Sequence, residues 1–203
     1  MFPKEIEKHI NGIKIKKFST KYHRSGDVVY NIGNEFILKV SENIDNLEKE
    51  RKANDLLCDY SFVSKTIEFI VHDNKAYYLK TMVKGNPLVL NKYLQHPEKL
   101  VDLLADAINT FHSIDLNLLG LKHNDDEVLV HGDFCLPNIL ARYNKISGFI
   151  DLSQVTVGEP WIDYAWAIWS LEYNLKTDKY TKLFLEKIGI EFDKEKYFKY
   201  INL

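Results

Sequence analysis

The stretch "HGDFCLPNIL", residues 131–140, decides the fold together with "GFIDL", residues 148–152. Two short apolar segments, residues 139–141 and 145–150, lie on either side of a turn at residues 143–144. Apolar runs of strand length around such a turn predict a β-hairpin. We therefore expect the first stretch to enter the hairpin as a loop and the second to lead out of it.

Three polar side chains, Asp133, Asn138 and Asp151, are expected to converge around this hairpin. An Asp followed five positions later by an Asn, and then by a second Asp beyond a hairpin, is the arrangement that kinases use for phosphoryl transfer. The first Asp accepts the proton of the attacking hydroxyl. The Asn and the second Asp supply the hard oxygen ligands that Mg²⁺ prefers. The pattern predicts a Mg²⁺-dependent site of phosphoryl transfer.

A lysine on a strand and a glutamate on a helix supply the next part of such a site. Residues 34–40, "NEFILKV", alternate with a period of two, which predicts a strand with Lys39 on the face opposite Leu38. Residues 43–60 show helical spacing, and Glu50 falls inside their inward stripe. In a kinase the strand Lys contacts the α- and β-phosphates, and the helix Glu holds that Lys. The alternative is a surface ion pair worth about 0 to 1 kcal/mol.

The turn "KYHRSGDVVY", residues 21–30, precedes that strand and would cover the phosphates, although it carries a single Gly. Ser25 and the backbone N–H groups beside Gly26 would then cradle them. Because Ser-Gly is also an ordinary turn dipeptide, Ser25 is equally well explained as structural. Downstream, the β-rich segments at residues 66–71 and 75–82 predict two further strands.

Gly85 and Pro87 interrupt regular secondary structure. They mark a boundary between two parts of the chain, which we place at residues 83–87. Pro97 opens an amphipathic helix, and the residues from Trp161 onward show helical patterning with Tyr and Phe inward and Lys outward. The order of elements predicts an α+β protein with a strand-rich first part and a mainly helical second part.

The composition of the chain excludes several function classes. The 203 residues carry a formal net charge of −2 and no Lys/Arg run, so we expect no nucleic-acid partner. No eighteen apolar residues run together and the N-terminus lacks a signal-peptide pattern, so we expect no membrane association. Cys58 and Cys135 are too few for a disulfide framework and fit a reducing compartment. These features predict a cytoplasmic protein.

Five segments occur in the order and spacing of a known family: "VVYNIGNEFILKV", "LEKER", "FHSIDL", "VLVHGDFCLPNIL" and "GFIDLSQ...GEPWIDYAWA". On these segments the chain resembles the aminoglycoside phosphotransferases, small-molecule relatives of the protein kinases, and looks most like their 3'-phosphotransferase branch. The resemblance implies a two-lobed, protein-kinase-like fold that binds ATP or GTP between its lobes. Residues 1–83 would form a nucleotide-binding lobe with an antiparallel sheet and one helix. Residues 84–203 would form a mainly helical catalytic and substrate lobe.

The resemblance also implies a role for each site residue. It implies that Asp133 acts as the base and that Asn138 and Asp151 bind Mg²⁺. The residues that bind the nucleotide or hold these groups in place are Ser25, Lys39, Glu50, the adenine-binding hinge at Thr81, Met82 and Val83, and Asp163 as support for the catalytic loop.

Three features depart from the drug-modifying members of the family. Only eighteen residues, 113–130, separate His112 from His131, where those members carry several dozen that build a wall of the substrate pocket. The sequence also ends before their acidic C-terminal residues, and Gln154 stands where they usually have an Arg. We therefore expect binding of Mg²⁺ and nucleotide with slow nucleotide hydrolysis. We expect poor phosphorylation of kanamycin unless a second subunit or a longer native chain completes the pocket.

Two functions from different classes follow from these observations. The first is an ATP- or GTP-dependent kinase of a small hydroxylated acceptor that can carry amines. The alternative is a nucleotide-binding pseudokinase or partner-binding module without small-molecule kinase activity. The first function is favoured because five positions of the predicted site are all retained, and drift would be expected to remove at least one of them. These positions are Lys39, Glu50, Asp133, Asn138 and Asp151.

Overall fold

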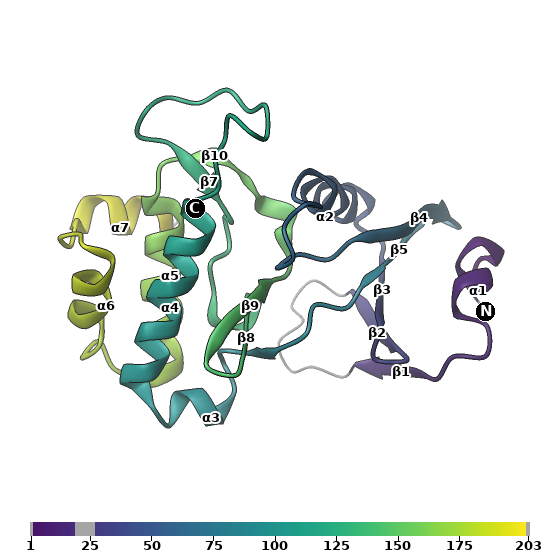
Figure 1. Ribbon diagram of the computed structural model, residues 1–203, viewed down its shortest axis with the longest axis horizontal. Helices are drawn as coiled ribbons and strands as arrows, with labels where there is room; N and C mark the ends of the chain where they lie inside the picture. The colour runs from purple at the N-terminus through teal and green to yellow at the C-terminus, as the bar shows by residue number, and fades with distance from the viewer. Residues whose placement is uncertain (1, 19–26, 202–203) are drawn as a thin grey trace. The chain divides into compact units, whose positions relative to one another are not determined.

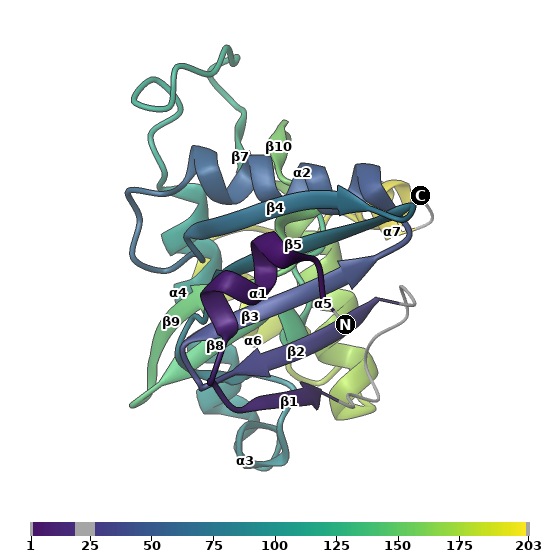
Figure 2. The same cartoon turned by 90° about the vertical axis from the view of Figure 1, so that its right-hand side faces the viewer.

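A five-stranded antiparallel sheet forms the centre of the first of two units, which spans Met1–Val83 (Figure 1). The computed structural model describes residues 2–18 and 27–201, so Ser25 lies outside the described residues. The strands lie in the order β1-β2-β3-β5-β4, as Figure 2 shows. Their bounds are Ile15–Phe18 for β1, Val28–Ile32 for β2, Phe36–Ser41 for β3, Thr66–His72 for β4 and Lys75–Thr81 for β5.

Helices cover both faces of this sheet. Helix α1 (Lys4–Ile10) lies across the face turned to the viewer in Figure 2, and helix α2 (Ile44–Leu56) packs on β4 and β5. The buried cluster beneath α1 comprises Ile6, Ile10, Ile32, Leu38 and Leu79. The buried cluster beneath α2 comprises Leu47, Ala76 and Tyr78. Because successive strand residues point to opposite faces, Leu38 faces α1 and Lys39 faces α2.

The prediction of a single helix in this unit is incomplete, because α1 is a second one. Its apolar stripe consists of Ile6 and Ile10, one turn apart, which is too short to stand out as a periodic pattern. The predicted strands and the α2 helix are confirmed. The hairpin between β4 and β5 turns through Asp73 and Asn74, which both adopt left-handed backbone angles, as a two-residue turn requires.

The second unit, Lys84–Leu203, is mainly helical. Helix α6 packs on α4 and helix α7 on α5, as Figure 1 shows. The helices are α3 (Asn91–Leu94), α4 (Pro97–His112), α5 (Trp161–Leu175), α6 (Thr181–Ile188) and α7 (Lys194–Ile201). The short strands are β6 (Asn86–Pro87), β7 (Val128–Val130), β8 (Ile139–Arg142), β9 (Lys145–Phe149) and β10 (Thr156–Gly158).

The predicted hairpin is present as β8 and β9, joined by Tyr143 and Asn144 with φ of 52° and 58°. β6 pairs with β8 to complete a three-stranded sheet, while β7 pairs with β10. Antiparallel sheets and helices together make this an α+β fold, as predicted. Among the described residues, none of the helices is both long and apolar enough to cross a membrane.

Candidate active site

A loop from β7 to β8 carries Asp133, and a buried carboxylate holds the start of this loop in place. Asp163, on the first turn of α5, is fully buried. It accepts hydrogen bonds from the backbone N–H of His131 at 2.8 Å and of Gly132 at 2.9 Å. The His112 Nε2 donates to the same carboxylate at 2.9 Å. Asp163 therefore fixes the backbone immediately before Asp133.

Gly132 allows this loop to approach the segment that follows Asp151. Its φ is +79°, a left-handed value, and an added Cβ would lie 2.6 Å from both the Cβ and the backbone oxygen of Gln154. Such an approach to backbone excludes any side chain at this position. The loop and the short 3₁₀ turn η2 (Leu152–Gln154) are thus packed directly together.

Asn138 is oriented by Asp133. Its Nδ2 donates to the Asp133 Oδ2 at 2.8 Å and to the Asp133 backbone oxygen at 3.1 Å. Because both bonds use the amide nitrogen, the amide oxygen is turned away from Asp133 and can serve as an acceptor or ligand. The five-residue spacing thus closes a short loop between the two side chains.

Asp151 is tied to this loop through the preceding residue. The Ile150 N–H donates to the Asn138 backbone oxygen at 3.0 Å, and the His131 Nε2 donates to the Ile150 oxygen at 3.0 Å. The other ring nitrogen of His131 accepts from the Asp133 N–H at 3.3 Å. The structure therefore brings Asp133, Asn138 and Asp151 into one hydrogen-bonded frame.

The backbone of Asp151 itself is strained. Its φ of 60° and ψ of 51° lie in the left-handed region, which costs a residue with a side chain about 1 to 3 kcal/mol and concentrates at functional sites. This conformation turns the chain sharply between β9 and η2.

Buried aromatic rings pack around the loop that carries Asp133. The His131 ring packs against Phe134 and Phe149, with ring centroids 5.8 Å and 6.4 Å away, and Phe111 joins the same cluster. Cys135 lies beside them, and burial raises the pKa of its thiol far above the ordinary value. A thiol that stays protonated is a poor nucleophile, so Cys135 acts as a packing residue.

The first unit brings Lys39 and Glu50 together. The Lys39 Nζ donates to the Glu50 Oε2 at 2.9 Å, and both residues are buried, Lys39 at 7% exposed and Glu50 at 0%. Two residues that the sequence analysis missed join them. The Asp27 Oδ2 lies 3.5 Å from the Lys39 Nζ, and the Lys80 Nζ donates to the Glu50 Oε1. The surface ion pair considered as the alternative is thereby excluded.

The sequence carried a signal for one of the two missed residues. On β5, Ala76, Tyr78 and Lys80 alternate with exposed or oppositely facing positions, so the period of two places Lys80 on the inner face with Tyr78. Asp27 had no such signal, because Gly-Asp after a turn is an ordinary turn pattern.

The predicted hinge is partly engaged within its own unit. The Thr81 N–H donates to the Lys65 oxygen at 2.9 Å, and the Met82 N–H donates to the Glu35 oxygen at 2.7 Å. Both bonds fix the course of the chain after β5. Of the three predicted hinge residues, Thr81 and Met82 thus have their backbone N–H groups engaged within the unit.

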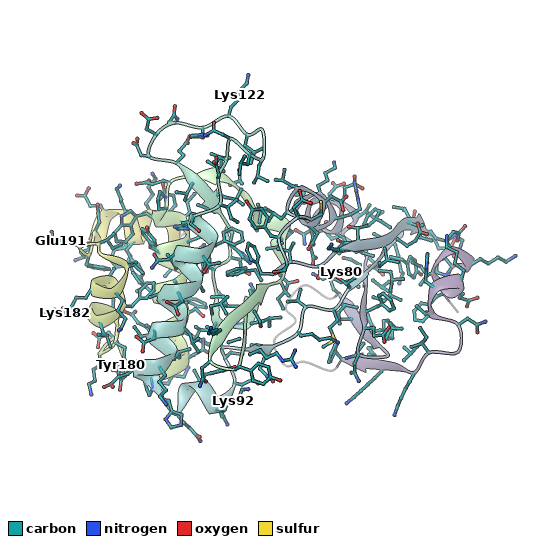
Figure 3. The ribbon with its side chains drawn as sticks, in the orientation of Figure 1. Lys80, Lys92, Lys122, Tyr180, Lys182 and Glu191 are labelled. Atoms are coloured by element: carbon teal, nitrogen blue, oxygen red, sulfur yellow. The ribbon has the colours of Figure 1, made fainter. Side chains whose placement is uncertain are left out.

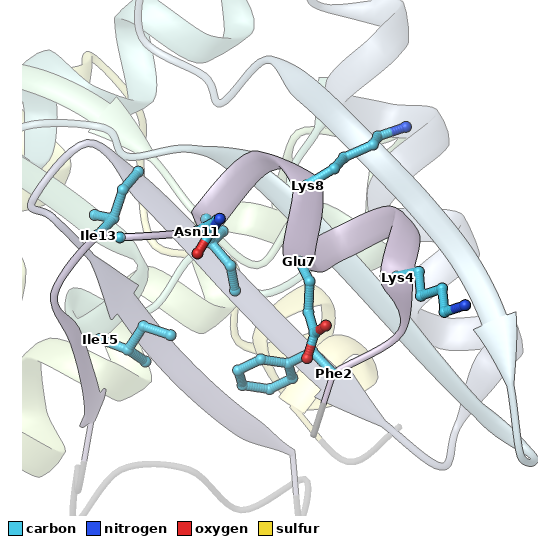
Figure 4. Close-up of a pocket in the computed structure, with 9 residues that line it drawn as sticks. Phe2, Lys4, Glu7, Lys8, Asn11, Ile13 and Ile15 are labelled. Carbon is cyan, nitrogen blue, oxygen red and sulfur yellow. The ribbon is translucent and has the colours of Figure 1, made fainter.

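A separate hollow of about 600 Å³ lies in the first unit between α1 and the start of β1 (Figure 4). Phe2, Ile13 and Ile15 line it together with Glu7 and Asn11. No described residue of the predicted site lines this hollow, so it is unrelated to the frame around Asp133.

Comparison with known proteins agrees with the motifs. The family model described as "Phosphotransferase enzyme family" matches residues 121–189. An aminoglycoside 3'-phosphotransferase of Niallia circulans is 41% identical over 124 residues, 56% of this chain and 47% of that protein. A probable aminoglycoside 3'-phosphotransferase of Lactococcus lactis subsp. lactis (strain IL1403) is 27% identical over 167 residues, 61% of this chain and 64% of that protein. The chain thus spans less than two thirds of either relative.

The fold comparison covers nearly the whole chain. The crystal structure of an aminoglycoside 3'-phosphotransferase of type VIII aligns with a TM-score of 0.77 at 17% identity, over 96% of this chain and 94% of that chain. The comparisons confirm the resemblance predicted from the motifs: the chain is similar in sequence to aminoglycoside phosphotransferases and has their kinase-like α+β fold.

Proposed function

We propose that this protein is a phosphotransferase that moves the γ-phosphate of ATP or GTP to a hydroxyl of a small molecule. The observation that carries the proposal is the hydrogen-bonded frame of Asp133, Asn138 and Asp151. A base and two oxygen ligands held on one short loop and hairpin are what in-line phosphoryl transfer requires. The first unit would serve as the nucleotide-binding lobe, and the second as the catalytic and substrate lobe.

Asp133 is assigned as the base. Its carboxylate would accept the proton of the acceptor hydroxyl as that oxygen attacks the γ-phosphorus. Asn138 donates to one carboxylate oxygen of Asp133, which orients the group without removing its second oxygen. The base is therefore aimed before the acceptor binds.

Asn138 and Asp151 fit the requirements of a Mg²⁺ site. The Asn138 amide nitrogen is committed to Asp133, which leaves the amide oxygen for a cation, and Asp151 supplies a carboxylate. Hard oxygen donors of this kind suit Mg²⁺, which also keeps waters and binds substrate phosphates. When bound, the ion would neutralise charge on the nucleotide phosphates.

Lys39 is assigned to the phosphates and Glu50 to holding Lys39, with Thr81, Met82 and Val83 as the adenine-binding hinge. Ser25 is assigned to the phosphate turn on the sequence alone. We also assign the reaction to the cytoplasm, where nucleoside triphosphates are available. Both cysteines are free, which agrees with that compartment.

The acceptor is proposed to be an aminoglycoside or a similar small molecule with hydroxyl and amine groups. The sequence relatives are named as aminoglycoside 3'-phosphotransferases. Proteins of the same fold have been captured with GDP and kanamycin, and with AMP-PNP and hygromycin B. These names support both the class of donor and the class of acceptor.

The test is transfer of label from γ-labelled ATP or GTP, with Mg²⁺, to a panel of kanamycin, hygromycin B, choline, sugars and protein. We expect labelling of at least one small hydroxylated acceptor, at a rate about 10² or more lower in the Asp133→Asn variant. Binding of nucleotide without transfer to any acceptor would favour the pseudokinase alternative. Absence of nucleotide binding would exclude the kinase and the nucleotide-binding pseudokinase and would leave the partner-binding module.

A further inference from the structure

Lys80 is a buried lysine for which the proposed reaction has no assigned role. It is 5% exposed, whereas Lys92, Lys122 and Lys182, labelled with it in Figure 3, are exposed. Burying an ammonium group is costly unless it is paired and hydrogen-bonded. Its position on β5 therefore requires a partner, and that partner is Glu50.

The strand register explains why two lysines reach one glutamate. Lys39 on β3 lies opposite Tyr78 on β5, and Lys80 is two residues further along the same strand. All three side chains therefore share the face that α2 covers. Glu50 projects from α2 between the lysines, with Oε2 bonded to Lys39 and Oε1 bonded to Lys80.

The formal charges of the four groups Lys39, Lys80, Glu50 and Asp27 sum to zero. Lys39 and Lys80 contribute two positive charges, and Glu50 and Asp27 contribute two negative ones. Without Lys80 the remaining three groups would carry one net negative charge on the face that holds Lys39. Loss of the Lys80 charge would therefore make the local field less favourable for an anionic phosphate near Lys39.

We propose that Lys80 is a positioning residue that neutralises Glu50 and holds its carboxylate in place, so that Lys39 can be drawn toward the phosphates. If Lys39 were the sole counter-ion of Glu50, its movement toward the phosphates would leave an unpaired buried carboxylate, which is costly. Lys80 keeps one oxygen of Glu50 paired throughout. The inference rests on the assignment of Lys39 to the phosphates in the proposed function.

The main test is the affinity of the full chain for Mg²⁺ and AMP-PNP, measured by calorimetry. We expect Lys80→Met to weaken binding about tenfold, within the range of coupled neighbouring residues, while kcat at saturating nucleotide stays unchanged. Lys80→Arg should restore most of the affinity because it restores the positive charge. Lys75→Met, on the exposed end of the same strand, is the matched control and should bind as the wild type does.

A double-mutant cycle distinguishes positioning from a direct phosphate contact. In a Glu50→Gln background the effect of Lys80→Met should fall below about twofold, because the two residues act through one carboxylate. A full tenfold loss in that background would overturn the inference. If Lys80→Met alone fails to fold, the charge-balanced pair Glu50→Gln/Lys80→Met still supplies this comparison against Glu50→Gln.

The outcome also separates this inference from the proposed function. Nucleotide binding by the wild type with equal binding by Lys80→Met would overturn the role of Lys80 and leave the proposed function standing. If the wild type binds neither Mg²⁺–AMP-PNP nor Mg²⁺–GTP, both the role of Lys80 and the proposed function are overturned.

Discussion

The two units hold a buried carboxylate in opposite ways. In the first unit, Glu50 is held by the ammonium groups of Lys39 and Lys80, which are borne on flexible stems. In the second, Asp163 is held by the backbone N–H groups of His131 and Gly132, with a third bond from a histidine ring. Side-chain ammonium groups can be redirected to a ligand, whereas backbone donors cannot leave without unfolding the loop. The first arrangement suits the adjustable phosphate contact proposed for Lys39, and the second suits a rigid loop under the proposed base Asp133.

The largest effect is expected from removing the carboxylate of the first unit. Glu50→Ala should lower the free energy of unfolding by about 3 to 5 kcal/mol, because two buried ammonium groups lose their shared partner. Denaturant unfolding measures the change. Glu48→Ala, on the same helix and partly exposed, should cost far less, because a solvent-exposed ion pair contributes little to stability. Equal costs for the two variants would mean that the buried cluster is no more important than a surface pair.

Asp133, the proposed base, should affect turnover and not nucleotide binding. Asp133→Asn should lower kcat by about 10² or more, since general-base catalysis contributes roughly 10² to 10⁴. The affinity for Mg²⁺–nucleotide should stay within about twofold of the wild-type value, since the variant removes an interaction made in the transition state. Steady-state kinetics beside calorimetry gives both quantities. A parallel loss of affinity would place Asp133 in nucleotide binding.

Replacing Asp163, the buried carboxylate of the second unit, should lower the free energy of unfolding less than replacing Glu50 does. Asp163→Asn turns an amide nitrogen toward donors that now face a carboxylate, and it should lower the free energy of unfolding by about 1 to 3 kcal/mol. Asp178→Asn, at an exposed position, is the control and should leave stability unchanged. If Asp163→Asn destabilises the fold more than Glu50→Ala does, the contrast between the two anchors is reversed.

The next effect is expected at Asp151, the proposed metal ligand, whose backbone is left-handed. Asp151→Gly keeps that backbone conformation accessible, because glycine adopts positive φ without a steric cost. The variant should lose the Mg²⁺-dependent rise in Tm on nucleotide binding. Asn144→Gly, left-handed in the β8–β9 turn, should change stability without affecting that rise.

The smallest effect is expected at the partly exposed contact between α7 and the start of α5. A hydrogen bond from Lys196, and to a smaller extent one from Tyr200, lowers the pKa of Glu159 below its ordinary value of 4.5. A lowered pKa in the folded state means that the contribution is fully present above pH 4.5 and is lost as the pH falls below it. Glu159→Gln should remove it, at a cost below about 1 kcal/mol at pH 7. Unfolding at pH 7 and pH 3 tests this, and a difference between the proteins that persists undiminished at pH 3 would contradict it.

The sequence was sufficient where a local pattern decides the structure. The β8–β9 hairpin follows from two apolar runs around Tyr143 and Asn144, and the facing of Lys39 follows from a period of two. Glu50 lies in the inward stripe of α2, as its helical spacing predicts. Each of these depends on residues close together in the chain, so propensity and periodicity were enough.

Tertiary structure alone decided how these pieces meet. Lys80 reaches Glu50 because β5 pairs with β3 in one register, and a shift by one residue would turn its side chain to the opposite face. Asp27 joins Lys39 across the same sheet, and Asp163 meets the His131 backbone from a helix 32 residues away. Contacts between segments distant in sequence leave no periodic trace within either segment. The sequence by itself therefore determined which groups the candidate site contains, and only the packed fold decided which charges balance them and which backbone donors hold them.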